Sequence, residues 1–233
     1  MIDITLTFLR THLDGPTAHF TPGGISTDVC LNTGIEGLFA AGEVTGGLHG
    51  ADRMGGNALT EAALFGIEAG RQMADFATGK ECAVSEDAEI TFKNPVLSMF
   101  KNDKFYLPPT LKEKDIYELR DELRNLYWNG LNPIRSEKSL ANALNELEQF
   151  RKKILPPESD NEEFTFNDGK IDEIKEIITL EMSSSLLELC LKSADLRKET
   201  RGGHFRKDFV KKDDNYNKNI FWQQGKVFFR DSS

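Results

Sequence analysis

Cysteine and long apolar runs are scarce in this 233-residue chain, and each scarcity excludes a class of protein. The three cysteines, Cys30, Cys82 and Cys190, are odd in number and far apart. They show neither a disulfide framework nor the paired spacing of a zinc site, so we expect a reducing, cytoplasmic location and predict no metal site. No apolar run approaches the ~20 residues of a membrane-spanning helix, and the N-terminal stretch lacks the regions of a signal peptide.

Positive charge is also in deficit. Lysine and arginine number 29 against 38 aspartates and glutamates, a net charge of −9. This balance argues against nucleic acid as a partner. Fourteen of the 19 glycines lie at or before Gly79, whereas the rest of the chain is rich in lysine and glutamate. The shift predicts a domain boundary near residue 80.

The first part of the chain contains a strand-to-helix passage. Residues 37–44 form a short apolar run bounded by glycines, which predicts a buried strand. A glycine-rich loop follows at 45–56, and Asn57 is a suitable N-cap for a helix that ends at Thr78-Gly79. Small apolar residues recur at helical spacing along this helix and predict close packing on a sheet. These residues are Leu59, Ala62, Ala63, Gly66, Ile67 and Gly70.

The second part of the chain is predicted to be helical. Residues 80–110 show little regularity, and three helices are predicted at 111–128, 136–154 and 171–197. Their apolar faces must be buried, which favours a small antiparallel bundle. The face predicted for the third helix consists of Ile174, Ile177, Ile178, Met182, Leu186, Leu189 and Leu196. The tail from residue 201 to 233 has few regular signals.

Several residues could bind a ligand. The amides at a helix start near Asn57 suit a phosphate, a carboxylate or a flavin edge, although a tight packing turn is the alternative. Glu43 at a strand end could hold ribose hydroxyls or form an ordinary salt bridge. His19, beside a glycine pair, and Arg53, with its planar fork, could bind a carboxylate or serve as structural residues. His49, four residues before Arg53, has no spacing typical of a metal site.

Two groups of motifs resemble one known family. HFTPGGI, GLFAAGEV and LHGADRMGGNALTEAALFG resemble the flavoprotein subunit of fumarate reductase and succinate dehydrogenase, with L-aspartate oxidase as a close relative. DLRKETRGGHFRKDF, followed by KKDD, resembles the final motif of this family, R-x-E-S-R-G-x-H-x-R-x-D. The resemblance implies an α/β plus α-helical fold: the C-terminal piece of a glutathione-reductase-like FAD-binding domain, then a three-helix bundle domain and an extended tail.

The resemblance also implies roles for individual residues. His19 and Arg53 match the residues that bind the dicarboxylate substrate in the family. Glu43 matches the glutamate that binds FAD, and Asn57-Ala58-Leu59 matches the turn that meets the flavin. Ala58 replaces the usual serine, which leaves only a backbone contact there, and Asp52 places a negative charge beside Arg53.

One family feature is missing from the sequence. The dinucleotide-binding motif G-x-G-x-x-G occurs nowhere, and in the family the proton-delivering arginine belongs to the same missing portion. We therefore predict no catalytic residue here and expect the C-terminal portion of a flavoprotein, inactive without its N-terminal portion. The expected organisation is a capping-domain remnant at 1–16, part of the FAD-binding domain at 17–79, a linker at 80–110, a helical domain at 111–200 and a tail at 201–233.

The implied reaction is the interconversion of fumarate and succinate by hydride transfer with the flavin N5 atom. The run Lys211-Lys212-Asp213-Asp214 favours this branch of the family. The implied partners are an N-terminal flavoprotein half and an iron–sulfur subunit, which would hold the chain peripherally at the inner face of a membrane. The alternatives are an L-aspartate oxidase fragment and a non-catalytic interaction module of a split flavoprotein.

Overall fold

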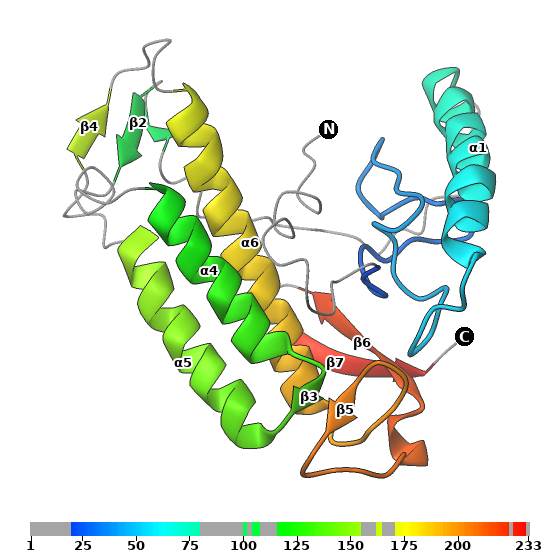
Figure 1. Cartoon of the computed structure of the whole chain (residues 1–233). Helices are drawn as coiled ribbons and strands as arrows, with labels where there is room; N and C mark the ends of the chain where they lie inside the picture. The colour runs from blue at the N-terminus through cyan, green and yellow to red at the C-terminus, as the bar shows by residue number, and fades with distance from the viewer. Residues whose placement is uncertain are drawn as a thin grey trace. The chain divides into compact units, whose positions relative to one another are not determined.

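The computed structural model describes residues 20–79, 100–101, 104–107, 116–154, 162–164, 171–223 and 226–231 (Figure 1). One compact unit contains residues 20–79, and a second contains the three helices that follow. Helices and short strands both occur, so the predicted mixture of α and β structure is confirmed. The predicted capping remnant at 1–16 lies outside the described residues.

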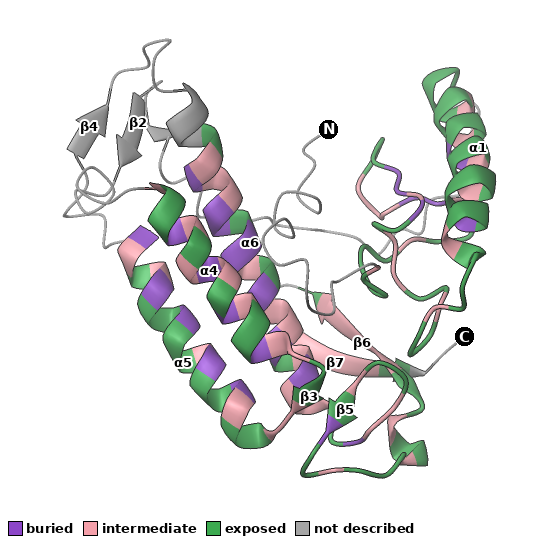
Figure 2. Ribbon diagram, viewed as in Figure 1, coloured by how far each residue is buried: buried purple, intermediate pink, exposed green. Residues whose placement is uncertain are grey.

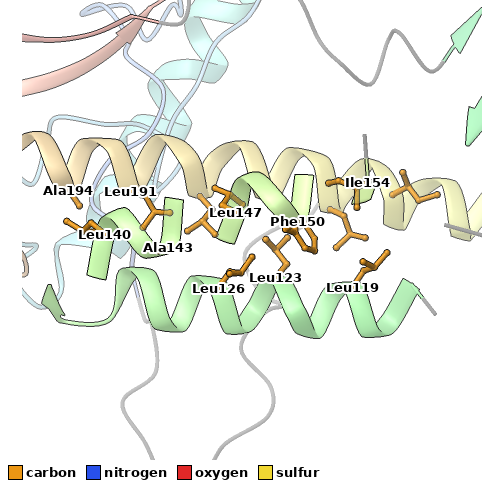
Figure 3. Close-up of a cluster of buried hydrophobic side chains, with 13 residues drawn as sticks. Leu119, Leu123, Leu126, Leu140, Ala143, Leu147, Phe150, Ile154, Leu191 and Ala194 are labelled. Carbon is orange, nitrogen blue, oxygen red and sulfur yellow. The ribbon is translucent and has the colours of Figure 1, made fainter. Parts of the chain in front are cut away.

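Three helices lie side by side in the second unit (Figure 1). They are α4 (Ile116–Leu131), α5 (Glu137–Ile154) and α6 (Ile171–Leu196), so each of the three predicted helices is confirmed. Thirteen buried apolar side chains from these helices form one core, most of them labelled in Figure 3. Because each fully buried leucine contributes about 1.5–3 kcal/mol, this core accounts for the packing of the unit.

Local signals define α5 at both ends. The Ser139 amide donates to the Ser136 hydroxyl oxygen over 3.2 Å, so Ser136 is the N-cap that satisfies a free amide of the first turn. Pro156-Pro157 follows shortly after the last helical residue, Ile154, and cannot continue a helix. These local causes explain why the predicted range of 136–154 agrees with the observed helix.

Gly130 lies inside a helix that continues past its predicted end. The first helix of this unit was predicted to end at residue 128, but α4 continues through Gly130 to Leu131. A Cβ atom at Gly130 would lie 2.9 Å from both the Ala143 Cβ and the Leu191 Cδ2 atoms. Gly130 is therefore a packing residue that lets α4 approach α5 and α6 closely.

The buried face of α6 differs from the predicted one. Met182 is 40% exposed and Leu186 48% exposed, whereas Leu180, Leu187 and Leu191 are buried. Of the predicted face, Ile177 is buried in the core and Ile178 packs against it, so the prediction is confirmed there and wrong at Met182 and Leu186. Apolar residues occur all round α6, so their spacing does not select one side. Although α6 is long, no helix in the described ranges is apolar enough over a sufficient length to cross a membrane.

Short strands occur where the sequence showed little regularity. A three-stranded antiparallel sheet has the order β1 (Phe100–Lys101), β2 (Lys104–Leu107) and β4 (Glu162–Phe164). A parallel pair joins β3 (Ile134–Arg135) to β5 (Phe205–Arg206), and β6 (Lys218–Gln223) pairs with β7 (Lys226–Asp231). Strands therefore occur within 80–110 and after residue 201, where the sequence carries few regular signals.

The predicted strand at 37–44 does not form. Only isolated bridges are present, an antiparallel one between Asn32 and Phe39 and a parallel one between Ile25 and Thr45. Gly37 and Gly42 adopt φ values of 75° and 81°, in the left-handed region, so the extended run between them is too short for a regular strand.

The helix of the first unit is α1 (Asn57–Ala77). Its N-cap is Gly56, with φ 88°, and not Asn57 as predicted. The apolar residues that the sequence predicts to pack on a sheet are exposed in this chain: Leu59 is 79% exposed and Ile67 is 67% exposed, while Glu61 and Ala69 are buried. Figure 2 shows the long exposed side of α1. Within the described residues, irregular segments cover the other side.

Candidate functional site

Two glycine-containing segments cross at the base of the candidate site. The Ile25 amide donates to the Val44 carbonyl over 2.8 Å, and the Gly46 amide donates to the Ile25 carbonyl over 3.0 Å. A Cβ atom on Gly24 would lie 2.1 Å from the Val44 carbonyl oxygen, closer than any side chain permits. Glycine is therefore required at position 24 for residues 20–25 to reach the loop that precedes α1.

Glu43 links the same two segments by a hydrogen bond. Its Oε1 atom accepts a hydrogen bond from the Thr21 amide over 2.9 Å. The residue is exposed, and an ionised carboxylate has further lone pairs that can accept from a ligand hydroxyl. Glu43, predicted to bind ribose hydroxyls, directly precedes Val44, whose carbonyl lies at the crossing point. Its carboxylate can accept a second hydrogen bond.

The start of α1 presents backbone donors. The Asn57 amide donates to the Met54 carbonyl over 3.3 Å, and no side chain caps the turn because Gly56 occupies the cap position. Ala58 and Leu59 follow directly, and their amides belong to the first turn, where no intrahelical acceptor exists. Together with the partial positive charge of a helix N-terminus, these donors suit an anionic or electron-rich group.

Arg53 lies in the loop before α1, on the face of an aromatic ring. Its Cζ atom is 4.5 Å from the centroid of the Phe20 ring, and its Nη1 atom donates to the Met54 carbonyl over 3.2 Å. Its Nε atom is buried and has no hydrogen-bond partner among the described residues. The guanidinium is always charged, and its planar fork of donors suits a carboxylate.

Glu61, which the sequence analysis did not single out, lies at the centre of the polar contacts. Its side chain is 1% exposed, and its Oε2 atom lies 2.7 Å from His49 Nε2. Its Oε1 atom lies 3.2 Å from the Thr45 hydroxyl oxygen. The sequence feature that could have identified Glu61 is an acidic residue among the small apolar residues of a helix. An acidic residue is rarely buried without a partner.

Phe20 connects these groups. Its ring meets the His49 ring edge-on, with centroids 5.2 Å apart and planes at 78°, and it carries Arg53 on its face. The structure therefore brings Arg53 together with His49 and Phe20. The other predicted substrate-binding residue, His19, lies outside the described residues, but it directly precedes Phe20 in the sequence.

The charged residues between Arg197 and Asp208 form a buried network. Glu199 is fully buried and accepts hydrogen bonds from Arg197 over 2.8 Å and from Arg201 over 2.6 Å. Arg206 is also fully buried; it binds Asp208 through two hydrogen bonds of 2.8 Å and donates to carbonyls at the end of α6. The glycine pair at 202–203 forms the turn between Arg201 and His204.

His204 joins three parts of this network as a neutral ring. Burial is the main cause that lowers its pKa, and nearby arginines lower it further. Arg135 can only donate, so the Nδ1 atom of His204 accepts from it over 3.0 Å. The Nε2 atom then carries the proton and donates to the Arg197 carbonyl over 3.0 Å. This network fixes the end of α6, and we assign it a structural role.

The network predicts acid sensitivity. Burial by itself would raise the pKa of Glu199, but hydrogen bonds from Arg201, the Asp213 amide and Arg197 lower the pKa to about 2. The unfolded chain therefore takes up this proton near pH 4.5, before the folded one does, and the stability that Glu199 contributes is lost as the pH falls from about 4.5 to about 2. Urea unfolding between pH 6 and pH 2.5 should show this loss, and Glu199→Gln should flatten it. An unchanged slope in the variant would contradict the assignment.

Two family models match the chain. One, described as the fumarate reductase flavoprotein C-terminal domain, matches residues 120–230. The other, described as an FAD-binding domain, matches residues 13–59. The first covers the helical unit and its buried charge network, and the second covers the Glu43 and Arg53 region with the start of α1.

Individual relatives agree with these matches. The 8-methylmenaquinol:fumarate reductase flavoprotein subunit of Wolinella succinogenes is 33% identical, over 85% of this chain and 32% of the relative. L-aspartate oxidase of Acinetobacter baylyi is 29% identical, over 83% of this chain and 32% of the relative. A solved chain of E. coli quinol fumarate reductase has a TM-score of 0.67 at 26% identity, covering 92% of this chain and 37% of that one. The chain thus spans about a third of the length of the curated relatives it matches.

Proposed function

Because this chain belongs to the flavoprotein family that includes fumarate reductase, succinate dehydrogenase and L-aspartate oxidase, we propose that it carries part of the active site of an oxidoreductase that interconverts fumarate and succinate. FAD is the cofactor, since one matched model is an FAD-binding domain and a matched relative is a flavoprotein subunit. When bound, FAD supplies hydride transfer at its N5 atom.

The residues at the start of α1 fit such a group. Ala58 and Leu59 offer amides that no side chain caps, and Leu59 presents an exposed apolar side chain beside them. Glu43, held by the Thr21 amide, would accept hydrogen bonds from ribose hydroxyls. In this proposal Asn57, Ala58 and Leu59 contact the flavin through backbone groups, so the alanine at position 58 is compatible with binding.

Arg53 carries the proposal for the substrate. Phe20 holds its guanidinium in place, with Cζ 4.5 Å from the ring centroid. A dicarboxylate would accept charge-assisted hydrogen bonds from the planar fork of this guanidinium. We propose that His19, which directly precedes Phe20 in the sequence, binds the same substrate. Clamping both carboxylates would orient the C–C double bond and polarise it toward hydride addition.

The remaining parts of the chain have proposed supporting roles. Residues 17–79 would complete an FAD-binding domain, residues 111–200 would form the helical domain, and residues 201–233 would be its tail. An N-terminal flavoprotein half would supply the rest of the nucleotide site, and an iron–sulfur subunit would exchange electrons with it. Such partners would hold the chain peripherally at a membrane.

One observation favours a second candidate, L-aspartate oxidase. Asp52 is exposed, directly before Arg53, and its carboxylate could accept a hydrogen bond from the ammonium group of an amino dicarboxylate. The same arginine would then bind the carboxylate of aspartate. The relative named L-aspartate oxidase is 29% identical, close to the 33% of the fumarate reductase relative, so identity does not separate the two candidates.

Flavin content and substrate choice test the proposal together. The chain should be purified alone and after co-expression with a matching N-terminal half, and each preparation examined by absorbance spectroscopy. We expect flavin and fumarate reduction only with the N-terminal half. Peroxide formation from aspartate would favour the oxidase instead. Stoichiometric FAD in the chain alone would contradict the need for a second half, and no flavin in either preparation would favour a non-catalytic interaction module.

A further inference from the structure

We infer that Glu61 is a positioning residue for Arg53 and acts through His49 and Phe20. The inference rests on the proposed function only for the ligand that Arg53 would bind. The positioning itself follows from the contacts within residues 20–61. Arg53 lies in a loop that contains Gly46, Gly47, Gly50, Gly55 and Gly56. Such a loop has high conformational freedom, so a fixed guanidinium requires specific anchors.

The first step of the argument is the burial of Glu61. Its side chain is 1% exposed and that of His49 is 9% exposed, so their 2.7 Å contact is largely removed from water. An ionised carboxylate can only accept, so His49 donates from Nε2. The Thr45 hydroxyl has one proton and two acceptors in reach, the Gly42 carbonyl at 2.8 Å and Glu61 at 3.2 Å. His49 is therefore the stronger of the two loop contacts made by Glu61.

The second step runs from His49 to Arg53. The hydrogen bond from Nε2 to Glu61 restrains the imidazole ring, which meets the Phe20 ring at 78° with centroids 5.2 Å apart. Phe20 also contacts Arg53, whose Cζ atom lies 4.5 Å from the centroid of the Phe20 ring. A cation over an aromatic face is a directional contact. The position of Phe20 therefore transmits the orientation of His49 to the guanidinium.

The third step explains why an acid occupies this position. Glu61 lies on α1 one turn after Asn57, the first residue of the helix, so it also fixes the loop relative to the amides proposed to meet the flavin. A neutral residue of similar size could fill the space but would not accept a charge-assisted hydrogen bond from His49. The carboxylate thus links the proposed substrate-binding residue to the proposed cofactor-binding turn.

Nuclear magnetic resonance of the full chain tests this inference directly. The ring current of Phe20 should change the chemical shift of the Arg53 Nε–H proton. Phe20→Leu would identify this signal, because it removes the displacement. Glu61→Gln leaves His49 only a neutral acceptor, so we expect part of this displacement to be lost while the methyl signals of the three-helix core remain unchanged. His49→Phe keeps an aromatic ring against Phe20 but removes the hydrogen bond to Glu61, and it should have the larger effect. Combining the two should add nothing to His49→Phe, because both act through one contact.

The matched control is Glu68→Gln, on the same helix. Glu68 pairs with Arg71 and Gln72, away from the loop, so its replacement should leave the Arg53 signal unchanged. If Glu61→Gln also leaves this signal at its original position while Phe20→Leu moves it, Glu61 does not position Arg53 and the inference is wrong.

Succinate titration separates the inference from the proposed function. We expect succinate to shift the Arg53 signal of the unsubstituted chain and to bind roughly tenfold more weakly to Glu61→Gln. If the unsubstituted chain does not respond to succinate even after co-expression with the N-terminal half, the proposed substrate is contradicted, while the ring-current comparison still decides the positioning role. Equal succinate affinities of the unsubstituted chain and Glu61→Gln would overturn the role of Glu61 in binding.

Discussion

Replacing Arg53 with alanine is expected to lower kcat/KM for fumarate by about 100- to 1000-fold in the flavin-loaded enzyme. The substitution removes a partly buried guanidinium whose Nε atom has no other partner in the described residues, and with it the proposed charge-assisted contact to a carboxylate. Flavin content should remain unchanged, because the amides of Ala58 and Leu59 do not depend on this side chain. Steady-state kinetics with an artificial electron donor measure the effect.

Two further variants make the Arg53 result specific. Arg53→Lys keeps the charge but loses the planar fork and the stacking on Phe20, so we expect a loss intermediate between the unsubstituted enzyme and Arg53→Ala. Arg71→Ala removes an exposed arginine that pairs with Glu68, and it should leave kcat/KM nearly unchanged. If Arg53→Ala has no more effect than Arg71→Ala, Arg53 does not bind the substrate.

Arg206→Met should lower the free energy of unfolding of the helical unit by about 3–5 kcal/mol. Arg206 is fully buried, pairs with Asp208, and donates to the Ala194 carbonyl at the end of α6. Methionine fills part of the space but leaves the carboxylate and the carbonyl without their donor. Asp208 also accepts from the Glu137 amide at the start of α5, so the loss should extend to the packing of both helices. Urea denaturation gives the measurement.

The control for this prediction is the neighbouring residue. Lys207 is exposed, and Lys207→Met should change the free energy of unfolding by no more than about 0.5 kcal/mol. A second variant separates the two causes of the expected loss. If Arg206→Met/Asp208→Leu recovers most of the stability, the loss came from the unpaired carboxylate; if it does not, the lost carbonyl contacts of α6 dominate. A loss in Arg206→Met no larger than that in Lys207→Met would contradict the structural role of Arg206.

Elements whose causes are local were predictable from the sequence. The range of α5 agrees with the prediction because Ser136, the leucine spacing and Pro156-Pro157 all act within a few residues of the helix. The C-cap of α1 at Thr78, followed by Gly79 with φ 72°, is a further local feature that the sequence indicated correctly. The family motifs were also recognisable, because they depend on residue order alone.

Features that depend on distant partners were not predictable in the same way. Contacts with α4 and α5 determine which side of α6 is buried. Gly130 lies within α4, at the place where α5 and α6 approach it closely. Short strands such as β3 and β5 are stabilised by pairing across the chain, so a two-residue segment carries no pattern of its own. Within the candidate site, Arg53 was identified from its motif. Glu61 and Phe20 were missed because their importance comes from contacts that only the fold creates.

The exposed side of α1 has a consequence for the amount of this protein in a cell. Leu59, Leu64 and Ile67 place an apolar stripe in water, and such a stripe is what chaperones hold and what brings a chain to proteases. We therefore expect turnover of the chain to depend on how quickly another surface covers α1. Under that expectation, abundance would follow the supply of the covering surface more closely than the rate of synthesis of the chain itself.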